Sequence, residues 1–476
     1  MQRSIRRRIS YRAIGIAVVV CIGPLTHAVE PTEGQSEATL DRFIADQMQR
    51  SVIPGAAVVI VDREGSVYAA GFGRTDSRIS IDIPFLIGSV SKTFTALAIA
   101  QLVDDGRLRF DDRVVDRLPG FALADTSSSG RITIRHLLTH TSGLSQWSGH
   151  DRRAQETALF NHISPSRPPG EGFEYSSLNY IILGQIIEAV SDVSYSEFVQ
   201  RRIFDPLEMR SSFVYGANGT AGVRELVRGH AYLFGFPLRL REPFPPPPLA
   251  PAGFIASSAR DLGSYLSMLL NDGSFRGRQI VSVGSLREMF TPWGGDAAGP
   301  GMAWGVGGER IGHAGNTRTF SARLVLLSKE GRGIVLLTNV NSGPFVPGSG
   351  ALMSGIVDAV EGRKPSIAVP YEILLKIGIL VLVLIGAIRT FFRFRRWQRL
   401  SHPPPRFTMR TTPIFLLEIA AAIAVVLVIP RWVGVPLLTI VGYFPDLGIA
   451  MIAGVITGVT GALLKSAAAH ATSARL

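Results

Sequence analysis

The sequence predicts an α+β domain that is followed by a membrane region of about three transmembrane helices. From about residue 36 to residue 363, short apolar alternations typical of strands mix with the longer periodicity of helices. Beyond residue 371, apolar runs approach the length of a bilayer-spanning helix. The mean hydropathy of +0.25, with 46% hydrophobic residues, is high for a purely soluble protein and agrees with such runs.

Residues 1–28 have the three parts of a secretory signal peptide. A basic start precedes an apolar stretch, Ala13–Leu25, and a Thr-His-Ala sequence ends at Ala28. Cleavage of this segment is the first interpretation and a retained anchor the alternative, and both predict that the chain beyond it is exported. The single cysteine, Cys21, excludes an intrachain disulfide and a cysteine metal site.

The segment 36–363 is expected to form one globular domain. Two apolar stretches joined by Arg-Glu-Gly, Gly55–Asp62 and Ser66–Gly73, predict a β-hairpin near its start. Two further strands are expected near its end, at residues 319–328 and at Gly331–Val340, and a helix from about Ser349 to Val360 closes the domain.

The stretch Arg241–Gly253 contains too many prolines for the interior of a helix or a sheet. It is therefore expected to be an extended surface loop. A docking motif for a protein partner is the alternative interpretation of the same composition.

Residues 364–371 read as a linker to a membrane region at 372–466. The predicted spans are about 372–391, 412–430 and 447–465. Val433–Tyr443 is the ambiguous stretch, because it is short and contains Pro436, and a crossing there would move the C-terminus to the other side. Glu418 is either a functional acid inside the membrane or a side chain that reaches water near the cytoplasmic end of its span.

The net charge of +12 is concentrated at two places. Met1–Arg12 has five arginines and Arg389–Arg410 has seven, with no acidic residue in either, and together they equal the net charge. Both clusters flank apolar runs, which favours a lipid bilayer as partner, with the clusters on the cytoplasmic side. Nucleic acid is disfavoured, because no stacking aromatics or groove-reading motif accompany the charge. We therefore predict a multi-pass protein of the cell (inner) membrane with its domain on the extracytoplasmic side.

One lysine stands out in a chain that uses arginine almost everywhere. Lys92 is the only lysine in the first 328 residues, and it follows Ser89 by three positions at the start of a helical pattern. That spacing places both side chains on one face of a helix. A desolvated lysine can accept the proton of a serine, whereas arginine stays charged at any working pH. The pattern indicates a nucleophilic serine with a lysine base; a helix-capping Ser89 beside a solvated Lys92 is the alternative.

Around this pair the sequence "IGSVSKTFTA" (Ile87–Ala96) resembles the nucleophile motif of class C serine β-lactamases and the related DD-peptidases, esterases and D-aminopeptidases. The resemblance covers roughly residues 38–362 and includes four later stretches in the expected order: Ile132–Leu144, Pro169–Glu188, Pro251–Leu262 and Gly312–Ala322. It implies the β-lactamase/transpeptidase-like fold, an antiparallel sheet flanked by helices beside a helical lobe, with the active site between them.

The resemblance also implies roles for single residues. Ser89 would be the nucleophile that forms an acyl-enzyme, and Lys92 its activating base. Tyr175 matches the tyrosine of the second motif, which shares proton transfer and protonates the leaving group; a packed core aromatic is the alternative. Ser177 stands where class C enzymes usually have asparagine, and a serine hydroxyl reaches less far.

The third motif departs from the β-lactamase pattern. His313 stands where those enzymes have the lysine of Lys-Thr-Gly, and histidine is mostly neutral at pH 7. Arg318 is a candidate for the missing positive charge. By resemblance, Gly315 would let substrate lie along its strand, and the backbone N–H groups of Ser89 and Asn316 would form the oxyanion hole.

These features predict a serine hydrolase that transfers an acyl group to water and uses no metal or organic cofactor. Its substrate would be a small molecule or peptide: a cell-wall peptide, a D-amino-acid peptide or a small ester, with β-lactam hydrolysis left open. His136 and His140, four residues apart, are a metal-binding alternative that lacks an acidic residue between them. Two other functions stay open, a non-catalytic sensor that signals through the membrane spans and a transport path through those spans.

Overall fold

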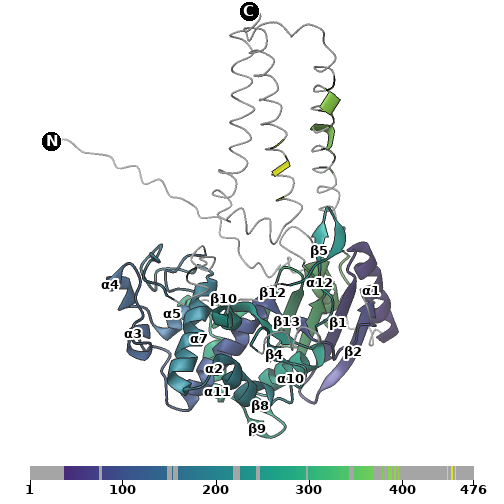
Figure 1. The fold of residues 1–476 in the computed structure, drawn as a ribbon. Helices are drawn as coiled ribbons and strands as arrows, with labels where there is room; N and C mark the ends of the chain where they lie inside the picture. Colours follow the sequence, from purple (N-terminus) through teal and green to yellow (C-terminus); the bar gives the residue numbers. More distant parts are fainter. Residues whose placement is uncertain are drawn as a thin grey trace, which may run out of the picture.

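The computed structural model describes most of the predicted domain (Figure 1). The described residues are 37–73, 78–146, 153, 159–217, 226–242, 247–295, 298–341 and 348–367, with isolated positions beyond residue 377. The signal peptide with Cys21, Glu418, Val433–Tyr443 and nearly all of the predicted spans lie outside them. Within the described ranges, no helix combines the length and the apolar character needed to cross a bilayer.

A seven-stranded antiparallel sheet forms one half of the domain, in the order β10-β11-β12-β13-β14-β1-β2. The predicted hairpin is confirmed as β1 and β2, and the two predicted late strands are β13 and β14. Strand β1 lies between β2 and β14, so the beginning and the end of the domain meet inside the sheet. The strands are β1 (Gly55–Val61), β2 (Ser66–Gly73), β10 (Ala298–Pro300), β11 (Gly305–Gly307), β12 (Arg310–Asn316), β13 (Ser321–Leu327) and β14 (Arg332–Thr338).

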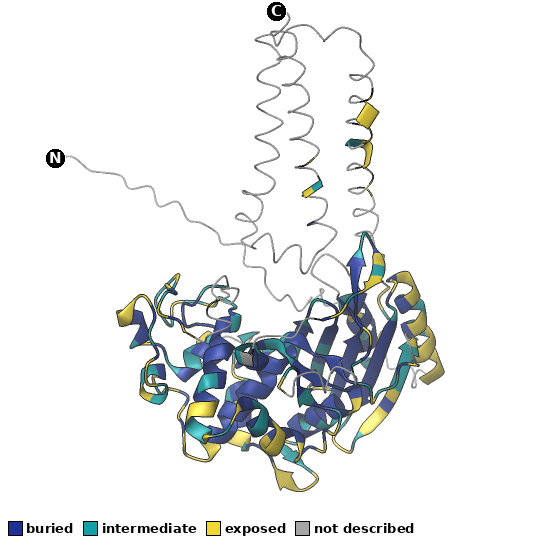
Figure 2. Cartoon of the chain, viewed as in Figure 1, coloured by how far each residue is buried: buried dark blue, intermediate teal, exposed yellow. Residues whose placement is uncertain are grey.

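Both faces of this sheet are covered, which explains why β1 is a continuous apolar run and does not alternate. On one face, α1 (Glu37–Arg50) and the predicted closing helix, α12 (Gly348–Val360), pack against Ala56, Val58 and Ile60. On the other face, Ala57, Val59 and Val61 belong to the main hydrophobic core, which α10 (Ala259–Leu270) shares. Figure 2 shows the central strands β1 and β14 as buried, and the edge strand β2 and the outer helix α1 as partly exposed.

The other half is a helical lobe built around α2 (Ser91–Asp104), with α7 (Ser177–Ser191) beside it (Figure 1). Every residue of α2 from Ser91 to Leu102 is buried, including polar side chains such as Thr95 and Gln101, which makes α2 the central helix of the lobe. The shorter helices are α3 (Val114–Arg117), α4 (Thr126–Ser129), α5 (Ile134–Leu138), α8 (Tyr195–Val199), α9 (Ala250–Gly253), α11 (Val283–Met289), the 3₁₀ turns η1 (Gly88–Val90), η5 (Pro247–Leu249) and η6 (Trp293–Gly295), and the π-helical η3 (Gln200–Phe204).

Three small sheets complete the described elements. Their strands are β3 (Phe85–Leu86), β4 (Phe213–Val214), β5 (His230–Leu233), β6 (Phe236–Arg239), β7 (Ile255–Ser257), β8 (Ser274–Phe275), β9 (Arg278–Gln279) and β15 (Val340–Asn341). The sheet β3-β7-β4 matters most for function, because β3 leads directly into the turn that carries Ser89.

From residue 247 on, the proline-rich stretch Arg241–Gly253 does not form the extended surface loop that its composition predicts. Its described part from residue 247 forms η5 and α9, and Ala250, Pro251 and Ala252 are buried. Proline is tolerated in the first turn of a helix, where the missing N–H has no intrahelical partner. Pro251 packs so closely against α7 that a Cβ on Gly184 would lie 2.2 Å from its Cγ. The prediction was wrong because apolar residues after the prolines fold back into the core.

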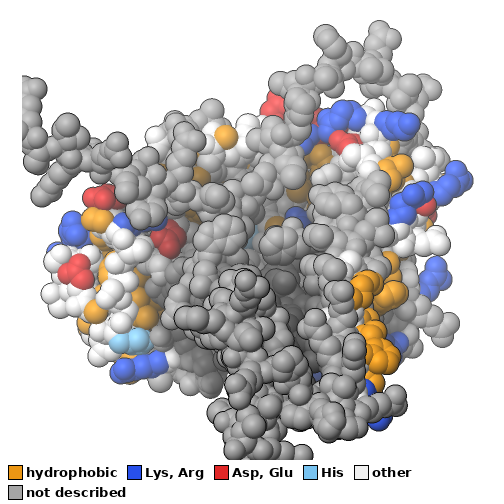
Figure 3. Space-filling view, turned by 90° about the horizontal axis from the view of Figure 1, so that it is seen from above, with side chains coloured by type: hydrophobic (Ala, Val, Ile, Leu, Met, Phe, Trp, Pro, Cys, Tyr) orange, Lys and Arg blue, Asp and Glu red, His pale blue; other side chains and the backbone are white. Residues whose placement is uncertain are grey.

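The surface of the described residues carries dispersed charge. Seen from above, Lys and Arg side chains lie at several separate places, with acidic, hydrophobic and other side chains between them (Figure 3). Many ion pairs join exposed partners, such as Arg50 with Asp46 and Arg260 with Asp82. Exposed pairs of this kind each contribute at most about 1 kcal/mol, so the stability of the fold depends mainly on the two hydrophobic cores.

Candidate active site

A tight turn presents Ser89 at the start of the buried helix α2. The turn η1 begins at Gly88, whose φ of +53° lies in the left-handed region that favours glycine. Space also requires glycine here, because a Cβ on Gly88 would lie 2.6 Å from the backbone nitrogen of Asn316. The chain therefore turns from β3 into α2 in direct contact with the end of β12.

Lys92 extends its side chain back toward Ser89 in a fully buried position. Its Nζ lies 3.2 Å from Ser89 Oγ and 3.4 Å from Ser177 Oγ, and it also donates a hydrogen bond to the carbonyl of Ala252. The same nitrogen lies 5.1 Å from the centroid of the Tyr175 ring. The Lys92 amine can therefore exchange a proton with Ser89 while the surrounding oxygens hold it in place.

Tyr175 approaches Ser89 from the loop before α7. Its phenol donates a hydrogen bond of 2.7 Å to Ser89 Oγ. Side chains from a turn, a helix and a distant loop thus converge on one serine oxygen. The structure brings together Ser89, Lys92, Tyr175 and Ser177, and the catalytic roles assigned to them stay predictions.

Strand β12 runs against the turn η1 that carries Ser89, here called the nucleophile turn, with almost no space between the two backbones. A Cβ on Gly315 would lie 2.0 Å from the carbonyl oxygen of Ile87 and 2.9 Å from the nitrogen of Ser89. Only a residue without a side chain permits this approach. It places the backbone at Gly315 and Asn316 beside Ser89, the arrangement that an oxyanion hole of two amides requires.

His313, also in β12, is a neutral group at pH 7. Burial lowers its pKa to about 4, and the charge of nearby Lys92 acts in the same direction. Its Nε2 is buried and has no hydrogen-bond partner among the described residues. His313 therefore supplies no fixed positive charge. Arg318 lies further along, and its backbone N–H donates to Glu242 Oε1 over 3.1 Å.

Two groups near the site come from the proline-rich stretch, and the sequence did not indicate them. The carbonyl of Ala252 accepts a hydrogen bond from Lys92 Nζ and helps to fix the position of the amine. Glu242 is buried, and it accepts hydrogen bonds from the Thr319 hydroxyl, at 2.5 Å, and from the backbone of Arg318. Burial raises the pKa of Glu242, against the effect of these hydrogen bonds. The available signals were the apolar sequence after the prolines and the family-like stretch Pro251–Leu262, but a backbone carbonyl has no sequence signature of its own.

The two histidines considered for a metal do not share a helical face. Helix α5 ends at Leu138, between His136 and His140. The Nδ1 of His136 accepts the N–H of Thr133 at the start of that helix. Across the described ranges, no group of three or more His, Cys, Asp or Glu residues is arranged to hold a metal ion.

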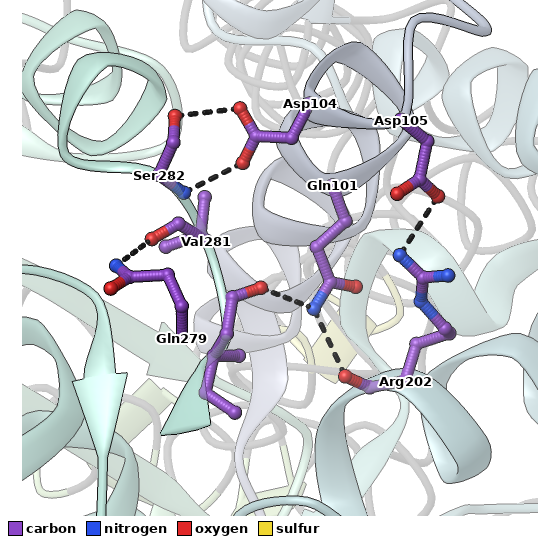
Figure 4. Close-up of a pocket in the computed structure, with 8 residues that line it drawn as sticks. Gln101, Asp104, Asp105, Arg202, Gln279, Val281 and Ser282 are labelled. Carbon is purple, nitrogen blue, oxygen red and sulfur yellow. Dashed lines mark hydrogen bonds and ion pairs between the residues drawn. The ribbon is translucent and has the colours of Figure 1, made fainter. Parts of the chain in front are cut away.

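A cleft of about 220 Å³ lies at the far end of α2 (Figure 4). With a rise of 1.5 Å per residue, Asp104 is roughly 18 Å along the helix from Lys92. There Gln101 Nε2 donates to the carbonyls of Arg202 and Ile280, and Asp104 accepts from the N–H and hydroxyl of Ser282. These bonds fix the C-terminal end of α2, and the cleft is separate from the candidate active site.

The fold and the cluster around Ser89 define the class as the β-lactamase/transpeptidase-like serine hydrolases. The chain belongs to the β-lactamase family, whose sequence model matches residues 40–352. This confirms the predicted fold and family for the globular part of the chain.

Relatives with this sequence pattern include penicillin-binding proteins. The chain is 31% identical over 325 residues to Penicillin-binding protein 4 of Amycolatopsis lactamdurans, which covers 63% of this chain and 84% of that protein. It is 28% identical over 333 residues to Protein flp of Staphylococcus aureus strain MW2, over 66% of this chain and 64% of the length of that relative. The octameric penicillin-binding protein homologue from Pyrococcus abyssi superposes with a TM-score of 0.58 and 26% identity, over 73% of this chain and 81% of that one.

Proposed function

We propose that this chain is a membrane-anchored, extracytoplasmic serine hydrolase that acts on amides or esters through an acyl-enzyme on Ser89. The observation that carries the proposal is the position of Ser89 Oγ, 3.2 Å from Lys92 Nζ and 2.7 Å from Tyr175 Oη. Two of the similar proteins, whose names describe a penicillin-binding protein and a homologue of one, support the same class of chemistry.

In the acylation step, Ser89 Oγ attacks the substrate carbonyl while Lys92, as the free amine, takes the serine proton. The oxygen of the tetrahedral intermediate then lies where β12 meets the nucleophile turn, next to the backbone N–H groups of Ser89 and Asn316. The bond to the leaving group breaks as Tyr175 delivers a proton to it, and Lys92 passes its proton to Tyr175. Water repeats these steps on the acyl-enzyme and releases the acid.

The neutral state of His313 guides the choice of substrate. A lysine at that position would bind a substrate carboxylate as a fixed cation, and His313 does not provide one at pH 7. We therefore propose cell-wall or D-amino-acid peptides, or small esters, as substrates, with β-lactam hydrolysis as a weak activity. Anchoring in the inner membrane is proposed from the apolar runs and the flanking arginine clusters of the sequence.

Labelling with a fluorophosphonate tests the proposal directly. We expect the wild-type chain to be labelled and the Ser89→Ala variant to remain unlabelled, because the probe forms a bond with an activated serine oxygen. Ser354→Ala is the matched control, since Ser354 is exposed on α12 and, among the described residues, forms its side-chain hydrogen bond within that helix. A folded wild-type chain that takes no label would contradict the proposal and favour a non-catalytic sensor. Persistent labelling of Ser89→Ala would show that the nucleophile is elsewhere.

A further inference from the structure

His140 has a position that neither packing nor metal binding explains. It follows α5, is 4% exposed, and adopts a φ of +58°, a conformation that residues other than glycine rarely adopt. Its carbonyl accepts the N–H of Glu174 over 2.8 Å, and its Nδ1 accepts the N–H of Ser176 over 3.1 Å. Because Glu174 and Ser176 flank Tyr175, the single residue His140 holds the backbone on both sides of the tyrosine.

The imidazole also contacts the phenol ring itself. The His140 and Tyr175 rings lie 4.5 Å apart between centroids at an angle of 33°. On the same imidazole, Tyr180 packs at 5.2 Å, and its hydroxyl is fixed on the carbonyl of Leu138 over 2.8 Å. His140 therefore contacts both Tyr175 and a second tyrosine that is itself fixed, so the imidazole forms a supported wall for the phenol.

Hydrogen bonds determine which nitrogen of His140 carries the proton. The amide oxygen of Asn179 accepts the hydroxyl of Ser142 over 2.6 Å, so its amide NH₂ points the other way, to His140 Nδ1 at 3.1 Å. Nδ1 is thus an acceptor and the proton is on Nε2. Burial, with the charge of Lys92 as a further cause, keeps the pKa of His140 well below its usual value, so the ring stays neutral. This is the state needed to accept the N–H of Ser176.

We propose that His140 is a positioning residue for Tyr175, which sets the phenol oxygen at Ser89 by binding both flanking amides and stacking on the ring. None of the hydrogen bonds or ring contacts of His140 among the described residues involves Ser89, so we expect His140 to act on the reaction through Tyr175. The kinetic part of the argument rests on the proposed hydrolase function.

Two substitutions separate the contacts of His140. His140→Phe keeps an aromatic wall and removes the acceptor for Ser176, whereas His140→Asn keeps an acceptor and removes the ring. We expect His140→Phe to slow fluorophosphonate labelling of Ser89 about 10²-fold, since a misplacement of about 1 Å costs that much. His140→Asn should slow labelling less, about tenfold, because the asparagine oxygen can still accept a hydrogen bond from Ser176 and so partly hold the loop in place. With a turned-over ester, the loss should appear in kcat, with KM unchanged.

A double-mutant cycle decides between positioning and a merely structural role. If His140 acts through Tyr175, then His140→Phe combined with Tyr175→Phe should label as slowly as Tyr175→Phe alone, within about twofold. If the two losses multiply, the proposal is overturned. Phe121→Leu is the control, since Phe121 is buried in the helical lobe and packs on Phe160, away from the site. Its effect on labelling should be small and independent of Tyr175.

A second measurement does not depend on catalysis. In NMR spectra of the full-length chain carrying ¹³C at the ζ carbon of tyrosine, the Tyr175 signal is identified as the one that disappears in Tyr175→Phe. We expect His140→Asn to move the Tyr175 signal, because the imidazole no longer lies against the ring, and to leave Tyr195 unchanged, since Tyr195 bonds to Thr95 elsewhere. An unmoved Tyr175 signal overturns the inference. If the wild-type chain takes no fluorophosphonate label but the Tyr175 signal moves in His140→Asn, the proposed hydrolase is refuted and the positioning role stays intact.

Discussion

A single methyl group at Gly315 should separate the two backbones that form the candidate oxyanion hole. In Gly315→Ala, the new Cβ would lie 2.0 Å from the oxygen of Ile87, 2.8 Å from the nitrogen of Val90 and 2.9 Å from that of Ser89. All three neighbours are backbone atoms of the nucleophile turn, so no side-chain rotation relieves the contact. Since Cβ atoms essentially never come within 3.0 Å of such atoms, β12 and the turn must move apart by at least about 1 Å.

This displacement should reduce the rate of acylation more than it reduces the stability of the fold. A shift of about 1 Å at a reacting centre costs roughly 10²-fold in rate, and loss of one oxyanion donor costs about 10² to 10³-fold. We therefore expect acylation to slow by about 10² to 10³-fold, which corresponds to about 3–4 kcal/mol in the barrier. Overpacking of this kind lowers the free energy of unfolding by roughly 1–3 kcal/mol, so the variant should still fold.

The assay is the rate of fluorophosphonate labelling of Ser89, with urea unfolding measured in parallel. Gly130→Ala is the matched control, because Gly130 has a φ of −69° and a Cβ there would meet its nearest atoms at 3.9 Å. The control should label at the wild-type rate and unfold no more easily. If Gly315→Ala labels within about threefold of wild type, then the close approach of β12 is not needed for acylation and the reasoning fails.

Two further predictions follow from the buried groups of the site. Lys92→Arg should reduce labelling of Ser89 by at least about 10³-fold while the protein stays folded by circular dichroism, because a guanidinium cannot take a proton from serine; labelling near the wild-type rate would exclude Lys92 as the base. His313 has a folded pKa of about 4, below its unfolded value, so the unfolded chain binds its proton first as pH falls below 6.5. From pH 7 to pH 4.5 the wild type should therefore lose about 2–3 kcal/mol more unfolding free energy than His313→Gln in urea titrations, and equal losses would refute the half-buried, neutral histidine.

Local sequence determined those parts of the fold and the site that depend on neighbouring residues. The apolar runs of β1, β2, β13 and β14 predicted their own strands, because each is a continuous or alternating pattern of the length of a strand. Ser89 and Lys92 were predicted together since three positions at the start of a helix place two side chains on one face. Their 3.2 Å separation agrees with that geometry.

Contacts between distant segments could not be predicted in that way. Tyr175 is 86 positions from Ser89, and only the resemblance to a known family placed it in the site. The carbonyl of Ala252 is 160 positions from Lys92 and belongs to a stretch whose prolines indicated a surface loop. His140 was considered as a metal ligand because its side chain type suggests one, while its main action is through hydrogen bonds of its own backbone and Nδ1 to a segment over 30 residues away.

The partners of Lys92 explain why this site can work with a lysine so deeply buried. Among the described residues, its hydrogen-bond partners are the hydroxyls of Ser89 and Ser177 and the carbonyl of Ala252, and none of them is a carboxylate. A carboxylate would favour the charged ammonium and hold the proton on the lysine. Hydroxyl oxygens can donate as well as accept, so they bind the amine in either state. Under the proposed mechanism, the buried helix α9 would have a chemical role beyond packing, because it supplies the third oxygen without adding a charge that would oppose proton transfer.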